Sequence, residues 1–565
     1  MPLSALFPHL NWVLPLVFLT TGAITVNAQT PSVVANPRAS EFDQFGTAID
    51  VDGDVAIVGA PNERTDGVWT GAAYVYRLTG GEWTLEATLL PVGFSPFGET
   101  QFGASVAVSG DLAVVAAPAE WVDYHSGDAN TRGVVYVFRR GTGGTWALEA
   151  ELAQAPFGDL LYGLDVDVED NTLVVGVKDR FVGPPGQGGG GGAVTGDGPS
   201  ASRAGDICHG NGVYELSRAE VVRYDGSTWA RADSLVVPDG LIGSGFGLSV
   251  SLDGDAVIVG APLWYTSPLC GDATDTDEVG RAYVFRRTGD EWAFEATLAP
   301  AGLADGDQFG TDVAASGDRV VVGAPYRDGV SLGSGAAFSF GYGSGAWVQE
   351  AEFVGVGTAQ LDQFGAAVAL EGDYAVVGAP RFRNANINLG ATYGFRYAGG
   401  AWQQGFRVTV DDDTAPTTNS PIWFALGGAV ALDGGHVAIG APQYGLYGST
   451  LARDIGRAYT YTLAEYFGLS TASGGTPAGT EASLGPAMPN PTSARAALSL
   501  SVDAPQHVRA TVYDALGRAV AVVLDAEVAA AAEVTVDASG LAPGVYVVRV
   551  EGESFAFARR FTVTR

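Results

Sequence analysis

A seventeen-residue pattern recurs along the chain and constrains the fold more than any other feature. In its clearest copy, FGTDVAASGDRVVVGAP at 309–325, a Phe-Gly pair leads into an alternating strand, a Ser-Gly-Asp turn and a second apolar strand. Similar copies begin at Phe45, Phe102, Phe246 and Phe364, and weaker ones begin at Tyr162 and Leu426. Self-similarity of this kind indicates one structural unit that is built several times.

Each copy continues in the same way. A connection of variable length leads to a third strand that starts at a glycine, and a short turn leads to a fourth strand that starts at a tryptophan, as at Gly71 and Trp83. The period-2 patterning and the turn residues predict a four-stranded antiparallel meander. One such sheet cannot bury both of its faces, but seven packed radially can. The repeat therefore predicts an all-β fold with a seven-bladed β-propeller.

The seventh unit is incomplete, because no Trp-led strand follows Gly456–Tyr461. At the other end of the repeats, Ser32–Ala35 stands at the same distance before Phe45 as Ala296–Ala299 stands before Phe309. We therefore expect the N-terminal segment to supply the missing outer strand of the last unit. Such a closure removes a free sheet edge and ties the two ends of the ring together.

These units resemble FG-GAP repeats, the family found in the integrin α-subunit head and in many bacterial secreted propellers. The resemblance assigns residues 29–463 to the propeller. Integrin-type repeats often carry an Asp-rich calcium loop between the first two strands, whereas this chain has tight turns such as Asp52-Gly53-Asp54. These turns offer too few oxygens for the roughly six to eight ligands that calcium takes, so we predict no metal and no cofactor.

A second domain follows the repeats. Residues 464–484 are rich in Ser, Thr, Gly and Ala and predict a linker. Short alternating segments in 485–565 predict a small Ig-like β-sandwich. Its Pro489-Asn490-Pro491 opening, YDALGR at 513–518 and GLAPGVYVVRV at 540–550 resemble the C-terminal sorting domain (type A) of the bacterial type IX secretion system. The resemblance implies the secretion machinery as a partner, and later removal of this domain with release or surface attachment of the propeller.

The first 28 residues predict a signal peptide. Trp12–Phe18 forms a short apolar core, and Val26-Asn27-Ala28 offers a small-residue cleavage site, so cleavage is expected between Ala28 and Gln29. The apolar run is too short and too interrupted for a membrane span, and no other stretch is apolar enough. We expect a secreted protein, or one attached to the outer-membrane surface of a bacterium.

The formal charge is −33, and Lys178 is the single lysine. Such an acidic surface repels nucleic-acid phosphates and anionic lipid, so neither nucleic acid nor a membrane surface is an expected partner. We interpret this composition as a soluble surface adapted to salt, with an acidic field that binds a ligand as the alternative.

The connections between the second and third strands are long and variable, whereas the other turns within a unit are short. Because alternate connections of a meander emerge at opposite ends, the long ones share one side, here termed the long-connection face. Long loops on a rigid scaffold commonly carry function. Exposed aromatic side chains there would anchor a protein or sugar, or else fold back over the propeller mouth. The candidates are Trp69, Trp121, Tyr124, Trp264, Tyr265, Tyr326 and Tyr444.

Cys208 and Cys270, the two cysteines, lie in corresponding connections of adjacent units. In an exported protein this placement predicts a disulfide, with two free thiols as the alternative.

No catalytic residue is predicted, because the chain has no HExxH motif, no paired metal-ligand spacing and no GxSxG elbow. We therefore favour a non-enzymatic binding or adhesion protein that holds an extracellular protein or polysaccharide. One alternative is a secreted polysaccharide hydrolase or lyase that uses loop carboxylates with His125 or His209. Another is a structural component of a surface layer or matrix.

Overall fold

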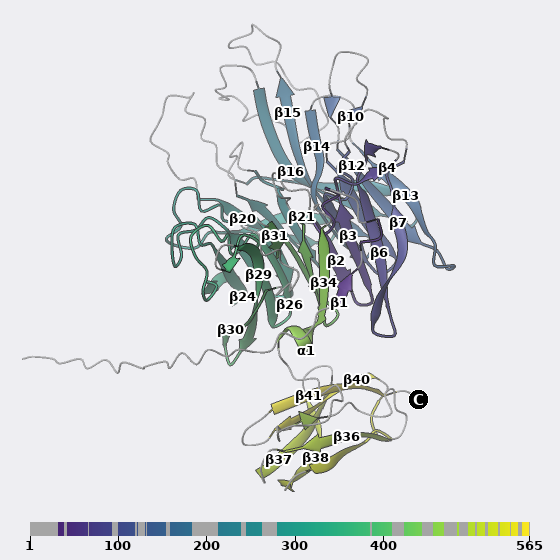
Figure 1. Ribbon diagram of the computed structural model, residues 1–565, viewed down its shortest axis with the longest axis vertical. Helices are drawn as coiled ribbons and strands as arrows, with labels where there is room; N and C mark the ends of the chain where they lie inside the picture. Colours follow the sequence, from purple (N-terminus) through teal and green to yellow (C-terminus); the bar gives the residue numbers. More distant parts are fainter. Residues whose placement is uncertain are drawn as a thin grey trace, which may run out of the picture.

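The computed structural model describes residues between 32 and 563 (Figure 1). The longer stretches left out within this range are 93–99, 123–129, 154–158, 183–212, 239–244, 263–278, 410–422, 443–455, 468–482 and 485–494. The predicted signal peptide with its Ala28–Gln29 cleavage site, and the predicted disulfide between Cys208 and Cys270, lie outside the described residues.

The described chain is almost entirely β-structure, and seven sheets between Ser32 and Thr462 are built on four antiparallel strands. The first sheet has β2 (Ile49–Asp52), β3 (Val55–Ala60), β6 (Ala72–Thr79) and β7 (Glu82–Leu89). The second has β8 (Ser105–Ser109), β9 (Leu112–Ala117), β12 (Val134–Arg140) and β13 (Trp146–Leu152). The third has β14 (Asp159–Glu169), β15 (Thr172–Val182), β16 (Val213–Tyr224) and β17 (Trp229–Val236). The fourth sheet has β18 (Ser249–Asp253), β19 (Ala256–Ala261), β20 (Arg281–Thr288) and β21 (Glu291–Leu298). The fifth has β22 (Val313–Ser316), β23 (Arg319–Ala324), β24 (Ala336–Gly343) and β25 (Ala346–Phe353).

The last two of these sheets carry additions. The sixth has β26 (Ala367–Glu371), β27 (Tyr374–Ala379), β29 (Ile387–Ala398) and β30 (Ala401–Val408), and β28 (Arg383–Asn384) and β31 (Trp423–Leu426) also pair with β29. The seventh has β32 (Ala429–Asp433), β33 (His436–Ala441), β34 (Arg457–Thr462) and β1 (Ser32–Val34). Two small ribbons lie in long connections, namely β4 (Arg64–Thr65) with β5 (Val68–Trp69), and β10 (Trp121–Val122) with β11 (Asn130–Thr131).

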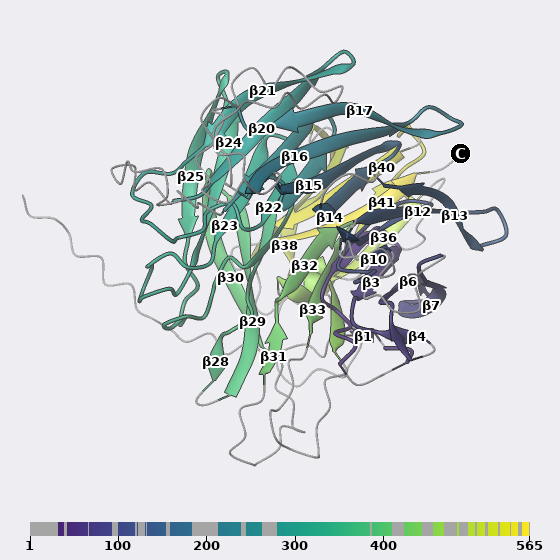
Figure 2. The same ribbon diagram turned by 90° about the horizontal axis from the view of Figure 1, so that it is seen from above.

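The first strands of these sheets contact one another in chain order. The contacts run from β2 through β8, β14, β18, β22 and β26 to β32, and β32 contacts β2 again. Seen from above, β14, β22 and β32 lie near the middle of the molecule, and the fourth strands β17, β21 and β25 lie towards its edge (Figure 2). This arrangement of four-stranded antiparallel sheets is consistent with propeller blades.

The Phe-Gly pair packs between neighbouring sheets. Phe102 is fully buried in a cluster that joins side chains of β3 and β6 to those of β8, β9 and β12. The glycine after each aromatic residue faces the glycine of the Gly-Ala-Pro segment in the preceding sheet. A Cβ atom on Gly323 would lie 2.0 Å from the carbonyl oxygen of Gly365. At this junction the neighbouring backbones therefore touch, and only a residue without a side chain fits at Gly323.

The ring closes through the N-terminal strand, which confirms the expected closure. Val33 of β1 lies opposite Tyr459 of β34 in an antiparallel register, and Val34 is buried. The glycine contact crosses the same junction, because a Cβ on Gly440 would lie 2.1 Å from the carbonyl oxygen of Gly46. The two ends of the repeat region are thus joined both within a sheet and between sheets.

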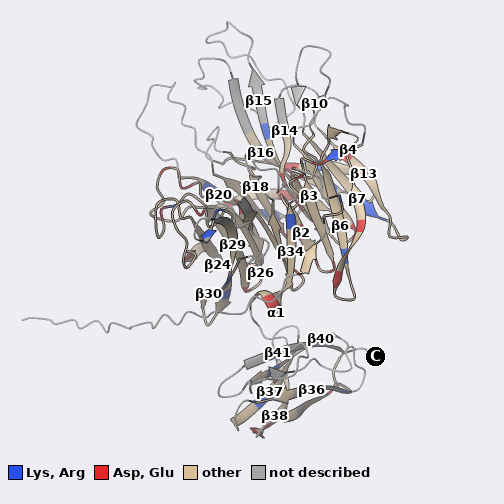
Figure 3. Cartoon of the chain, in the orientation of Figure 1, with Lys and Arg blue, Asp and Glu red and all other residues tan. Residues whose placement is uncertain are grey.

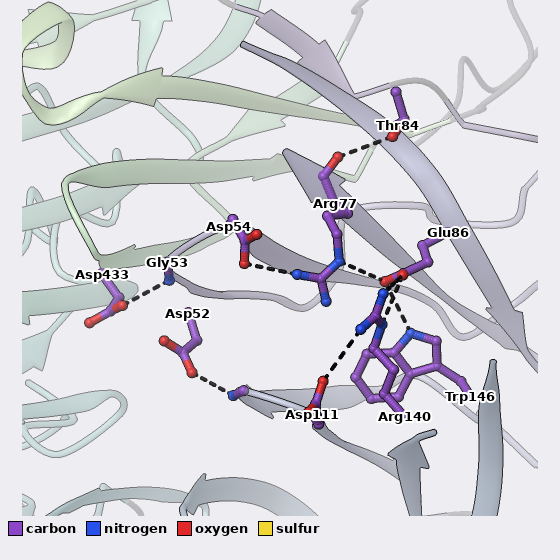
Figure 4. Close-up of polar contacts among 11 residues, drawn as sticks. Asp52, Gly53, Asp54, Arg77, Thr84, Glu86, Asp111, Arg140, Trp146 and Asp433 are labelled. Carbon is purple, nitrogen blue, oxygen red and sulfur yellow. Dashed lines mark hydrogen bonds and ion pairs between the residues drawn. The ribbon is translucent and has the colours of Figure 1, made fainter. Parts of the chain in front are cut away.

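The tryptophans that start the fourth strands do more than pack. Each of four indole Nε1–H groups donates to a glutamate of the preceding sheet, in the pairs Trp146–Glu86 (3.3 Å), Trp229–Glu149 (2.9 Å), Trp347–Glu295 (3.0 Å) and Trp402–Glu350 (2.9 Å). Glu86 also accepts from Arg77 of its own sheet and Arg140 of the next (Figure 4). Each of these glutamates follows a tryptophan by three residues, a Trp-x-x-Glu spacing visible in the sequence.

The third sheet differs from the sequence expectation. The repeat copy that begins at Tyr162 ends its second strand at Lys178, but β15 extends to Val182, and β16 begins at Val213. The register continues without interruption from Leu173↔Val222 to Val182↔Val213. The repeat pattern ends at Lys178 and so gives no sign that the pairing continues beyond it.

The chain remains packed a little beyond the repeats. Helix α1 (Leu463–Tyr466) begins with a capping box between Thr462 and Glu465. Tyr466 and the following Phe467 are buried against β33 and β34, at the start of the expected linker. The packed chain therefore extends at least to Phe467.

Seven further strands lie near the C-terminal end of the described residues. One sheet has β35 (Ser483–Leu484), β36 (Arg495–Ser501) and β39 (Ala531–Asp537), and the other has β38 (Ala519–Val528), β37 (Gln506–Asp514), β40 (Gly544–Glu551) and β41 (Ala556–Val563). Both sheets contribute to one hydrophobic cluster, with Leu498 from β36 and Val548 from β40 fully buried. Within the part of the chain that the structure describes, no helix is long and apolar enough to cross a membrane.

The glycine contact between sheets yields a first prediction. Replacing Gly323 by Ala should lower the free energy of unfolding by roughly 1–3 kcal/mol or more, because the added methyl meets a backbone carbonyl that cannot turn aside. The matched control is Gly343→Ala in the same sheet, where a Cβ meets nothing within 4 Å. Its effect should stay within about 0.5 kcal/mol. Equal unfolding midpoints for the two variants in urea would contradict this account.

Candidate functional site

An axial cavity lies where the first strands meet. Its volume is about 500 Å³, and its walls come from the first strand of every one of the seven sheets. Acidic residues lie close to β18, near this region (Figure 3). The carboxylates that line the cavity are Asp50, Asp52, Asp165, Asp167, Glu169, Asp170, Asp253, Glu371 and Asp433.

Side chains at the ends of the first strands link each sheet to the next. The residue before the turn accepts a hydrogen bond from the backbone N–H of the turn in the following sheet. The pairs are Asp52 with Gly110 (2.6 Å), Ser109 with Asp170 (3.1 Å), Glu169 with Gly254 (2.5 Å), Asp253 with Gly317, Ser316 with Gly372 (3.0 Å), Glu371 with Gly434, and Asp433 with Gly53 (3.0 Å). The last pair crosses the closing junction (Figure 4). We call this set the axial latch.

A second level of such bonds lies deeper along the first strands. Asp50 accepts from the backbone N–H of Val108 at 2.8 Å, and Asp167 accepts from that of Leu252 at 2.7 Å. Equivalent bonds join Asp165 to Val250 (2.9 Å) and Asp312 to Val368 (2.7 Å). Strand N–H groups that face the axis have no partner within their own sheet, so these carboxylates satisfy donors that would otherwise be buried unpaired.

Burial changes the protonation of these carboxyl groups. It raises the pKa of Asp167 to about 7, and the neighbouring charges of Asp165 and Glu169 add to the effect. Burial also raises the pKa of Asp312 to about 7, and it raises that of Asp50 well above its ordinary value, with the charge of Asp167 contributing. Hydrogen bonds from backbone N–H groups oppose these shifts. Asp167 and Asp312 therefore titrate near neutral pH.

This site was not predicted from the sequence. The signal is the alternation of acidic and apolar residues in IDVDG at 49–53 and LDVDVED at 164–170, which places successive carboxylates on one side of a strand. We interpreted these residues only as strand ends and hairpin turns. Among the described residues, no group of three or more His, Cys, Asp or Glu side chains is arranged to hold a metal ion.

A second hollow, of about 640 Å³, lies on the side of the short turns, between the fifth and sixth sheets. Gly341 stands where other third strands carry an arginine, such as Arg77 and Arg286. Arg319 of β23 pairs with the glutamate of this sheet instead, with its guanidinium 3.3 Å from Glu350. The same guanidinium lies 3.0 Å from Asp373. The charges that line this hollow are therefore largely paired with one another.

The structure describes part of the predicted long-connection face. Tyr326 is exposed, with 38% of its surface accessible, and Trp69 is partly covered by the guanidinium of Arg64 at 3.7 Å from its ring centroid. Trp121 lies in β10. Tyr124, Trp264, Tyr265 and Tyr444 lie outside the described residues.

Sequence comparison bears on both halves of the chain. FG-GAP repeats match at residues 35–76, 229–285, 292–340 and 347–395, and a secretion system C-terminal sorting domain matches at residues 487–564. The chain carries FG-GAP repeats and a sorting domain. The protein is therefore exported through type IX secretion, to the cell surface or the extracellular milieu, and its C-terminal domain interacts with the secretion machinery.

Other comparisons add little. No curated protein matches the chain. Among solved structures, an acylaminoacyl peptidase of Pyrococcus horikoshii is similar over 80% of this chain, with 9% sequence identity and a TM-score of 0.37. The chain spans 57% of the length of that protein. A likeness of this size carries no argument about function.

The raised pKa values predict a stability that falls as pH rises. Asp167 binds its proton more tightly in the folded state, with a pKa of about 7, than in the unfolded chain, where the pKa is about 3.9. Its contribution is complete below about pH 4 and is lost as pH rises to about 7. In Asp167→Asn an amide oxygen still accepts from Leu252 but never ionises. Urea unfolding should therefore show a smaller loss of stability between about pH 4 and 7 than in the wild type.

Asp225→Asn is the control for this measurement. Hydrogen bonds from Thr228 and Ser227 lower the pKa of Asp225 to about 2, so this group does not titrate in the neutral range. The variant should keep the wild-type pH slope. An unchanged slope in Asp167→Asn would contradict the proposed titration.

Proposed function

We propose that the protein is a non-enzymatic binding protein, secreted or held at the cell surface. Its seven four-stranded sheets form a closed seven-bladed propeller, and a small Ig-like sandwich follows. The long-connection face holds an extracellular protein or polysaccharide.

The observation that carries this proposal is the difference between the two ends of the sheets. The turns between first and second strands are two residues long, as at Gly53-Asp54 between β2 and β3. The connections between second and third strands run from 61 to 71 in the first sheet and from 325 to 335 in the fifth. Because the strands are antiparallel, these two sets of connections leave the sheets at opposite ends. Variable loops on a rigid frame supply most binding sites of such folds.

The chemistry of the described loops supports binding rather than catalysis. Tyr326 presents an exposed ring on this face, whereas Phe382, another aromatic of these connections, is buried under Arg407. The buried carboxylates of the axis accept backbone hydrogen bonds between sheets, as Asp50 and Asp167 do. A structural role of this kind accounts for them without an acid/base couple.

Binding can be tested on arrays of extracellular polysaccharides and proteins with the purified secreted protein. Tyr326→Ala combined with Trp69→Ala should weaken binding about tenfold or more, as removal of aromatic anchors usually does. Val348→Ala is the matched control, because Val348 is exposed but lines the hollow on the short-turn side. Unchanged binding in the double variant would show that the long-connection face does not bind the ligand. Release of soluble sugars from a bound polysaccharide would favour the hydrolase or lyase alternative.

A further inference from the structure

Five exposed aliphatic side chains gather on the long-connection face, and we term them the apolar patch. Val330 and Leu332 belong to the connection between β23 and β24, and Val354, Val356 and Leu361 belong to the connection between β25 and β26. Their exposed fractions run from 37% for Val354 to 71% for Val356. Single exposed aliphatic residues are ordinary, but a contiguous group on a monomer surface is typical of an interaction site.

Contacts join the two connections that carry these side chains. The backbone N–H of Leu361 donates to the carbonyl of Leu332 at 3.2 Å, which ties the two connections together. The Leu361 side chain lies over Gly333, where an added Cβ would come within 2.9 Å of its Cδ2 atom. Val354 lies over Gly329 in the same way, at 3.7 Å. The two connections thus form one surface.

Leu361 occupies this surface in an unfavourable backbone conformation. Its φ is +64°, in the left-handed region that a branched side chain rarely adopts. Leu361 lies three residues before Phe364, the phenylalanine of its repeat copy. The corresponding residue before Phe309 is Gly306, which has a φ of +85°. A glycine would meet the backbone requirement without strain. Backbone strain that is kept for the sake of an exposed apolar side chain suggests a functional use for that side chain.

The flank of the patch towards the sixth sheet is basic, although the chain as a whole carries a charge of −33. Arg407 donates to the carbonyl of Val356 at 3.5 Å, and the backbone N–H of Arg381 donates to the carbonyl of Asp362, next to Leu361. Arg383 acts electrostatically on Asp362. All three arginine side chains are exposed. On the other flank, the carboxylate of Glu352 is already paired with Arg327 at 2.9 Å.

We infer that the apolar patch binds a peptide segment whose apolar side chains stand next to carboxylates. The aliphatic side chains would bury the apolar residues of the peptide, and the three arginines would attract its acidic ones. This inference rests on the proposed function and names the partner class for one part of the long-connection face.

The test is a selection from a phage-displayed library of random peptides on the purified secreted protein. Enriched peptides should carry apolar residues beside Asp or Glu. A selected peptide should bind at least about tenfold more weakly to Leu361→Gly and to Val356→Ser. It should also bind more weakly to Arg383→Gln and at higher salt, because screening reduces the attraction between exposed charges.

The chain offers a matched control for Leu361→Gly. Phe42 holds the same position before Phe45, with φ +66° and half of its surface exposed, but it lies at the junction of the seventh and first sheets. Both Leu361→Gly and Phe42→Gly should raise the unfolding temperature, because both remove the left-handed strain. Only Leu361→Gly should weaken the binding of the selected peptide.

Three outcomes would overturn the inference: selection of basic or purely polar peptides, undiminished binding to both patch variants, or self-association of the protein that Val356→Ser abolishes. The proposed function is judged separately. Binding of an extracellular ligand that is lost in the Tyr326 and Trp69 variant but kept in Leu361→Gly leaves the proposed function in place and removes this inference.

Discussion

The contact between glycines of neighbouring sheets sets the spacing on which the rest of the fold depends. The glycine after the aromatic residue and the glycine of the Gly-Ala-Pro segment bring two backbones together, as at Gly365 and Gly323. A Cβ at either position would force the sheets apart. Such a displacement would withdraw the aromatic ring from its cluster and separate Trp Nε1 from its glutamate. The second sheet is an exception, because Ala116 replaces the usual glycine and its Cβ lies 3.0 Å from the position that a Cβ on Gly163 would take.

This spacing also explains the acidic axis. The first strands of neighbouring sheets contact one another without pairing as a ladder, and side-chain oxygens accept from their N–H groups instead. Ser249 and Ser251 serve the same purpose as the aspartates, by accepting from Val313 and Ala315. A hydroxyl meets the geometric need as well as a carboxylate does. The carboxylates at Asp167 and Asp312 therefore add a proton equilibrium that the geometry alone does not require.

The sequence predicted the parts of the fold that repeat. The Phe-Gly pair, the four-stranded unit and the closure by residues 32–34 all followed from spacing, because each is a local pattern or a constant distance along the chain. It did not predict the extension of β15 and β16, where pairing continues beyond the repeat. It also did not predict the replacement of a third-strand arginine by Arg319, since Gly341 and Arg319 are neighbours only after folding. The axial latch was predictable only in part. The alternation of its residues is visible in the sequence, but their hydrogen-bond partners lie in the next sheet and are not.

The same frame controls what the long-connection face can present. The residue after the left-handed position is a buried aspartate at Asp43, Asp307 and Asp362. Asp307 and Asp362 each accept from a backbone N–H three residues earlier, and this bond bends the chain so that the residue between must adopt positive φ. The backbone conformation is therefore fixed by a buried hydrogen bond, whereas the side chain at that position points away from it. Gly306, Leu361 and Phe42 share nearly the same turn with three different side chains. The buried hydrogen bonds of the turn offset the strain, so a substitution at this position changes the surface without changing the fold.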